Sequence, residues 1–120
     1  MSATDLGKLC IQVHLDRAPG LDTARLAEVA EAIAKRTPRS RGFDVSHGED
    51  EGAYLNLNFI TESLPDAWCQ LRMELLEGAE FGDALRGACM CICTGAQGWD
   101  DYRVLQHFDP AVPLDSLADD

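Results

Sequence analysis

Basic residues are scarce in this chain: ten lysines and arginines stand against twenty-one aspartates and glutamates, a formal net charge of −11. Residues 1–48 hold seven basic and six acidic residues, a net of +1, whereas residues 49–120 hold three basic and fifteen acidic, a net of −12. Such a field repels nucleic acid and anionic membranes and attracts cationic partners. We therefore expect a basic protein as partner, and neither nucleic acid nor a membrane, although acidity that serves only solubility stays an open alternative.

Long apolar runs and paired cysteines are also missing. The first residues have no apolar core of a signal peptide, and no stretch approaches the roughly 20 apolar residues that a spanning helix needs. The five cysteines are an odd number without a CxxC pair, which argues against a disulfide scaffold. The sequence thus predicts reduced thiols and a cytoplasmic location.

The sequence contains none of the common catalytic motifs. It has no GxSxG elbow, P-loop, HExxH helix or deaminase pattern. His14, His47 and His107 fall on three different predicted strands, and no nucleophile is placed beside any of them. We expect no catalytic residue, and a non-catalytic role is favoured over an enzymatic one.

The first half of the chain shows a strand followed by a helix. Residues 8–15 alternate between apolar and polar side chains, as in a half-buried strand. Asp22 is a suitable helix cap, and apolar residues from Leu26 to Ile33 recur at helical spacing. This pattern predicts a helix over residues 23–36.

The second half continues with a hairpin, a helix and a second hairpin. Residues 42–47 and 53–60 are predicted to pair as strands across a glycine-flanked acidic turn. A second helix should begin after Ser63 and end at Gly78. Residues 87–93 and 101–108 are the last two expected strands, and residues 79–86 are left without an assignment.

The resulting order is β-α-β-β-α-β plus one extra strand. This order resembles the ferredoxin-like, or split βαβ, pattern, which is an antiparallel sheet with two helices on one face. The resemblance concerns fold order alone and does not select a function. We expect a single α+β domain over residues 1–109 and a loosely attached acidic tail over residues 110–120.

Such a sheet would leave one face open. Its first and third strands would present six side chains there: Cys10, Gln12, His14, Tyr54, Asn56 and Asn58. With Met90 and Ile92 as core residues on the fourth strand, Cys89, Cys91 and Cys93 would point to the same open face. Same-face neighbours on a strand lie roughly 7 Å apart, which opposes a shared tetrahedral metal ion. We expect no metal and no cofactor.

Two hypotheses from different classes follow. The first is an adaptor, inhibitor or immunity-type protein that binds a basic partner through two acidic loops and an aromatic anchor: Glu49, Asp50, Glu51, Trp99, Asp100 and Asp101. Tyr54 is a second candidate anchor. The alternative is a small-molecule-binding or enzymatic domain that uses the six open-face side chains as a pocket wall. A homodimer through the open face is also kept as an expectation.

Overall fold

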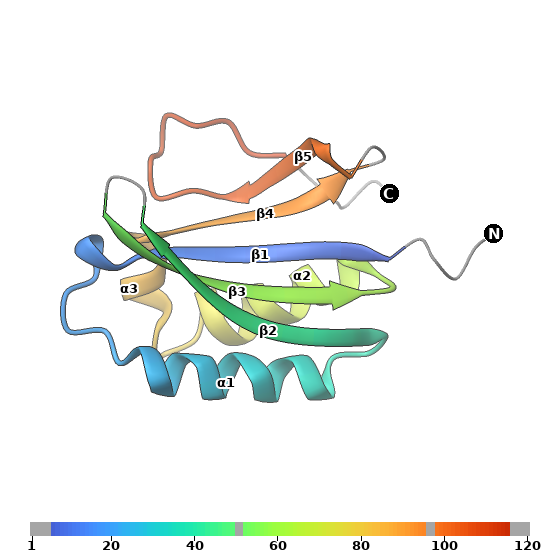
Figure 1. The fold of residues 1–120 in the computed structure, drawn as a ribbon, viewed down its shortest axis with the longest axis horizontal. Coiled ribbons are helices and arrows are strands. Elements are labelled where there is room, and N and C mark those ends of the chain that lie inside the picture. Colours follow the sequence, from blue (N-terminus) through green and yellow to red (C-terminus); the bar gives the residue numbers. More distant parts are fainter. Residues whose placement is uncertain (1–5, 50–51, 96–97, 116–120) are drawn as a thin grey trace.

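The computed structural model of the chain describes residues 6–49, 52–95 and 98–115. Within these residues the α+β class and the antiparallel sheet are confirmed (Figure 1). The strands are β1 (Gly7–His14), β2 (Ser40–Glu49), β3 (Ala53–Thr61), β4 (Cys89–Gly95) and β5 (Gly98–Gln106). The α-helices are α1 (Thr23–Arg36), α2 (Leu64–Leu71) and α3 (Gly82–Arg86). None of the helices in the described part is long and apolar enough to cross a membrane.

Two irregular turns complete the element list. A 3₁₀ turn, η1 (Leu15–Arg17), follows β1, and a π-helical turn, η2 (Arg72–Leu76), continues α2. The short α3 falls in the segment that the sequence left unassigned. The described part of the chain therefore contains three α-helices where two were expected.

The five strands form one sheet in the order β2-β3-β1-β4-β5, and every neighbouring pair is antiparallel. Central β1 pairs with β3 on one side and with β4 on the other. Figure 1 looks onto the uncovered face of this sheet, and the helices lie below and behind it. The edges of the sheet are β2 and β5.

The core lies between the helices and one face of the sheet. Strand residues Leu9, Ile11 and Leu57 are fully buried there, together with Leu26 of α1 and Leu71 of α2. Leu75, Leu76 and Leu85 extend this cluster through η2 and α3. Strands β1, β3 and β4 place every second side chain in the core, so their alternate residues point to the other face.

Both long helices begin at the caps that the sequence predicts. The Asp22 carboxylate accepts a hydrogen bond from the Arg25 amide at 3.0 Å, and Ser63 Oγ accepts one from the Asp66 amide at 3.3 Å. These bonds satisfy amide groups that lack a partner within the first helical turn. The caps fix where each helix starts relative to the sheet.

The chain after β5 turns back along this strand. The Asp115 amide donates to the Val104 carbonyl at 2.7 Å, and the Val104 amide donates to Asp115 Oδ2 at 2.8 Å. Residues 107–115 therefore form a closed loop, here called the C-terminal strap, that begins and ends at β5 (Figure 1). The last part of the predicted tail, residues 116–120, lies outside the described residues.

Candidate interaction surfaces

The open face of the sheet carries the six side chains that the sequence predicts there. The register pairs Cys10 with Asn58, Gln12 with Asn56 and His14 with Tyr54, so these residues form three adjacent rows across β1 and β3. All are half-buried apart from Cys10, which is buried with 7% exposure. The structure thus brings the predicted ligand-binding residues together on one surface.

Polar contacts order part of this face. Asn58 Nδ2 donates to Asp44 Oδ1 at 2.8 Å and to Ser46 Oγ at 3.2 Å, which ties β3 to β2. His14 Nε2 lies 2.9 Å from Gln12 Oε1. Asn56 Oδ1 differs, because it is buried and has no hydrogen-bond partner among the described residues. A buried acceptor without a donor costs free energy, so a donor brought by a ligand would be favoured at this atom.

The expectation for the β4 cysteines was wrong. Cys89, Cys91 and Cys93 are fully buried in the core, and Met90 and Ile92 lie half-buried on the open face instead. The register explains this, because the three cysteines stand opposite Val13, Ile11 and Leu9, and directly opposed residues share a face. The open face therefore holds one thiol, that of Cys10, and two apolar side chains from β4.

Two of the buried thiols, those of Cys10 and Cys91, favour the protonated form. Burial, with a smaller contribution from the nearby Asp44 carboxylate, raises the pKa of Cys10 to about 11. Burial also raises the pKa of Cys91 well above its usual value, with additional contributions from Cys89 and Cys10. Thiolates are the nucleophilic and metal-binding form of cysteine, so these positions favour packing over reactivity. Across the described part of the chain, no three histidine, cysteine or acidic side chains are grouped so that they could hold a metal ion.

An aromatic cluster closes one end of the open face, and the sequence did not indicate it. The Phe108 ring lies 5.0 Å from the His14 ring, edge to face, and 4.5 Å from the His107 ring. The Arg17 guanidinium lies 4.1 Å from the Phe108 ring centre, within cation–π range. Phe108 was assigned to the last strand, whereas it belongs to the C-terminal strap. Only the return of the chain along β5 brings it to His14.

The two predicted acidic loops lie far apart. Glu49 ends edge strand β2, whereas Asp100 and Asp101 are exposed near the start of β5 at the opposite edge. Four strand spacings separate the edges, about 19 Å, which exceeds the Debye length of about 10 Å at 0.1 M salt. They do not form one acidic surface. Asp50 and Glu51 lie outside the described residues.

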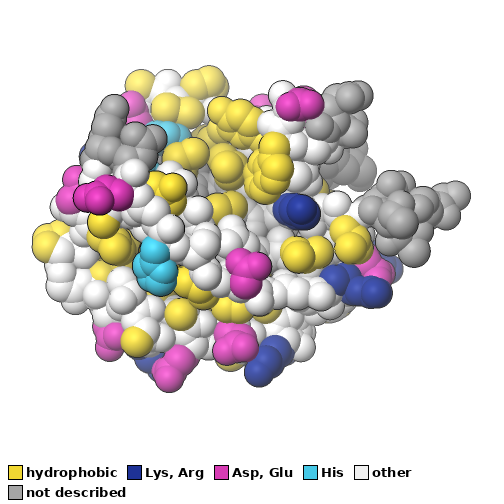
Figure 2. Space-filling model, in the orientation of Figure 1, with side chains coloured by type: hydrophobic (Ala, Val, Ile, Leu, Met, Phe, Trp, Pro, Cys, Tyr) yellow, Lys and Arg dark blue, Asp and Glu magenta, His cyan; other side chains and the backbone are white. Residues whose placement is uncertain are grey.

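The surface around β5 combines exposed aromatic and acidic side chains. Trp99 is 44% exposed and Tyr102 is 51% exposed, with Asp100 and Asp101 between them. Leu114 of the C-terminal strap is 55% exposed, next to the Asp115 that is hydrogen-bonded to Val104. Figure 2 shows hydrophobic side chains gathered over β4 and β5. We call this set the β5 surface: Trp99, Asp100, Asp101, Tyr102, Leu114 and Asp115.

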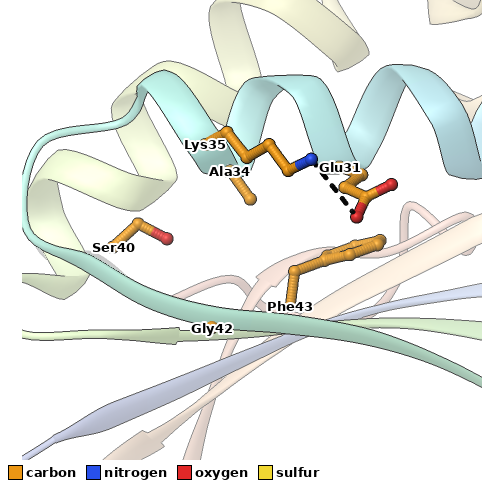
Figure 3. Close-up of a pocket in the computed structure, with 6 residues that line it drawn as sticks. All are labelled: Glu31, Ala34, Lys35, Ser40, Gly42 and Phe43. Carbon is orange, nitrogen blue, oxygen red and sulfur yellow. Dashed lines mark ion pairs between the residues drawn. The ribbon is translucent and has the colours of Figure 1, made fainter.

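A small pocket lies on the other side of the molecule, between α1 and β2 (Figure 3). Its volume is about 260 Å³, and its lining comprises Glu31, Ala34, Lys35, Ser40, Gly42 and Phe43. Lys35 Nζ and Glu31 Oε2 form an ion pair at 3.7 Å above the Phe43 ring. No pattern in the sequence indicated this pocket, because it depends on how closely α1 approaches β2.

Comparisons with known proteins add no assignment for either surface. No protein-family model, no curated protein and no solved structure matches this chain.

Proposed function

We propose that this chain is a non-catalytic binding protein, of adaptor, inhibitor or immunity type, whose partner is a basic protein and not nucleic acid or a membrane. The observation that carries the proposal is the β5 surface, where exposed Trp99 and Tyr102 flank the carboxylates of Asp100 and Asp101. Glu49 ends the strand at the other edge of the sheet, and Asp50 and Glu51 lie outside the described residues, so these three are left out of the proposed contact.

This composition suits a partner that presents lysine or arginine. Aromatic side chains are the commonest energetic anchors of protein interfaces, and their ring faces also attract cationic groups. Carboxylates around such an anchor raise the association rate with a basic surface and disfavour acidic partners. The β5 surface thus contributes to binding in two ways. The carboxylates increase the association rate, and the aromatic rings slow dissociation.

Kinetic measurements on two variants test this separation. The wild-type chain, Asp100→Lys/Asp101→Lys and Trp99→Ala are each immobilised and compared for binding of a protein first captured from the cell extract. The charge reversal should slow association, and the tryptophan truncation should accelerate dissociation by tenfold or more, as for an interface anchor. The matched comparison is Asp100→Lys with Glu49→Lys, because each single substitution changes the charge by the same amount and Glu49 lies at the far edge of the sheet.

Two outcomes would contradict the proposal. In the first, the captured protein binds with an association rate that neither salt nor the Asp100/Asp101 reversal changes. In the second, Glu49→Lys slows association as much as Asp100→Lys does, which would move the contact away from β5. The acidity would then serve solubility alone.

A small-molecule site on the open face is the second candidate. Asn56 Oδ1 supports it, because this buried acceptor has no hydrogen-bond partner among the described residues and would gain a donor from a ligand. Cys10, Gln12, His14, Tyr54 and Asn58 surround it through the strand register. A compound that raises the melting temperature of wild type, but not of Asn56→Leu, would favour this candidate over the basic partner.

We also infer a ferredoxin-like topology with one added strand. Support comes from the order β2-β3-β1-β4, from the antiparallel pairing, and from helices that pack on one face. Strand β5 is the addition, and it extends the sheet beyond β4. A reducing, cytoplasmic location is part of the same proposal and rests on the odd number of cysteines, none of which needs a disulfide partner in the core packing.

A further inference from the structure

Strand β2 is a long, open edge of the sheet. It has ten residues and, within the described part of the chain, it pairs with β3 alone. The backbone groups on its outer side therefore take no part in the sheet ladder. Phe43 and Val45 on its core side are only half-buried, and the pocket between α1 and β2 opens beside them. An edge of this kind is a ready template for another strand.

The charge distribution makes this edge suitable for a second copy of the same chain. Residues 22–49, which form α1 and β2, contain five basic and five acidic residues and have no net charge. The remaining residues carry the entire net charge of −11. Two copies joined through β2 would meet at their neutral sides, and the acidic β5 edges would lie at the two far ends of the assembly. Most other contacts between copies would bring acidic surfaces together.

The sequence of β2 selects one register for such a contact. Around a two-fold axis normal to the sheet, core-side residues face core-side residues, so a residue can stand opposite itself but not opposite its chain neighbour. Centring the pairing on Val45 opposes Phe43 with His47 and places Arg41, at the β-bulge between Ser40 and Gly42, near Glu49 at both ends. Centring it on Asp44 opposes two carboxylates, which is unfavourable. Centring it on Phe43 or Ser46 opposes Arg41 with Val45 or Glu49 with Phe43, so the ion pairs are lost.

We propose that β2 is the binding site for a second copy of this chain, which adds antiparallel to it with Val45 at the two-fold axis. The contact joins two five-stranded sheets into one. Arg41 of each copy faces Glu49 of the other, and the half-buried Phe43 and Val45 become covered. This site lies on the edge opposite to the β5 surface and differs from a dimer through the open face.

Charge-swap variants test the register. Sedimentation velocity from micromolar to millimolar chain concentration should show a dimer of the wild-type chain. Arg41→Glu and Glu49→Arg should each raise the dissociation constant about tenfold, because each creates two like-charge contacts per dimer. The double variant Arg41→Glu/Glu49→Arg should return the constant to near the wild-type value, since both opposed pairs are restored with exchanged signs.

Two controls keep the result specific. Arg41 also forms an ion pair with Glu62 within the chain, so Glu62→Gln reports the loss of that pair without a change on β2. It should leave dimerisation unaltered. Circular dichroism and the unfolding midpoint establish that each variant is folded.

Three results would overturn the proposal. A monomer over the whole concentration range would do so, and so would a dimer whose dissociation constant is equal in all three charge variants. A dimer lost in Ile92→Lys but not in the β2 variants would place the contact on the open face of the sheet, where Ile92 lies opposite Cys10.

Discussion

Cysteine occupies two kinds of position in this molecule. Cys10, Cys89, Cys91 and Cys93 are buried, whereas Cys69 of α2 is exposed beside Met73, with its Sγ 3.7 Å from the Met73 Sδ. A thiol reacts as the thiolate and only where a reagent can reach it. Position in the fold, not the CxCxC spacing, therefore determines which thiols are accessible.

This difference in exposure predicts the result of a thiol titration of the native protein. We expect one cysteine to react rapidly with an aromatic disulfide reagent and the other four to react only on unfolding. Cys69→Ser should remove the rapid phase, and Cys91→Ala should leave it unchanged. A rapid phase of two or more thiols in the native wild type would contradict the burial of the β4 cysteines.

The raised pKa of Cys10 predicts a loss of stability in alkali. Its folded pKa of about 11 lies above the ordinary cysteine value of 9.0, so the unfolded chain releases this proton at lower pH than the folded chain. The stabilisation is fully present below pH about 9 and is lost as the pH rises through about 11. Urea unfolding at increasing pH should show the decline, and it should be shallower for Cys10→Ser. An equal decline in both proteins would assign the effect to other groups, Cys91 first.

At the scale of single elements, strict periodicity was a reliable guide. Strand β1 and helix α1 were predicted within one residue of their observed bounds, because both have one apolar side and α1 has an Asp22 cap. For strand β4 the prediction of which side chains face the core was wrong. Its cysteines, Met90 and Ile92 are apolar or small on both sides of the strand, so alternation does not show which side is buried. The β3 and β1 site residues were predictable from alternation. The Phe108 cluster and the α1–β2 pocket were not, since each depends on segments that meet only in the folded chain.

The hydrogen bonds that hold the C-terminal strap to β5 can be tested by substitution. Asp115→Ala removes the bond from the Val104 amide to Asp115 Oδ2, and should lower the free energy of unfolding by about 1 kcal/mol. Hydrogen exchange at the Val104 amide should accelerate. Asp109→Ala is the control, because Asp109 accepts from the Ala111 amide and does not touch β5. Unchanged exchange at Val104 in Asp115→Ala would mean that the strap is not held there in solution.

At the scale of the whole molecule, the two proposed contacts should respond to salt in opposite directions. Binding of a basic protein at the β5 surface weakens as salt screens the attraction, whereas pairing of two chains of net charge −11 strengthens as salt screens their repulsion. Binding and sedimentation experiments between about 0.05 and 0.5 M NaCl should show the two trends, with a Debye length that falls from about 14 to about 4 Å. A parallel response of both equilibria would mean that they share one surface.

The hydrogen bonds between Asp115 and Val104 have a consequence for assembly size. They use the backbone groups of Val104 on the outer side of β5, so the chain's own strap occupies that edge at the position of Val104. A sheet with one open and one occupied edge can add a single neighbour and then has no free strand to offer. Edge pairing of this protein should therefore stop at two subunits and should not propagate into fibres. Removal of the strap would open a second edge and allow filament growth.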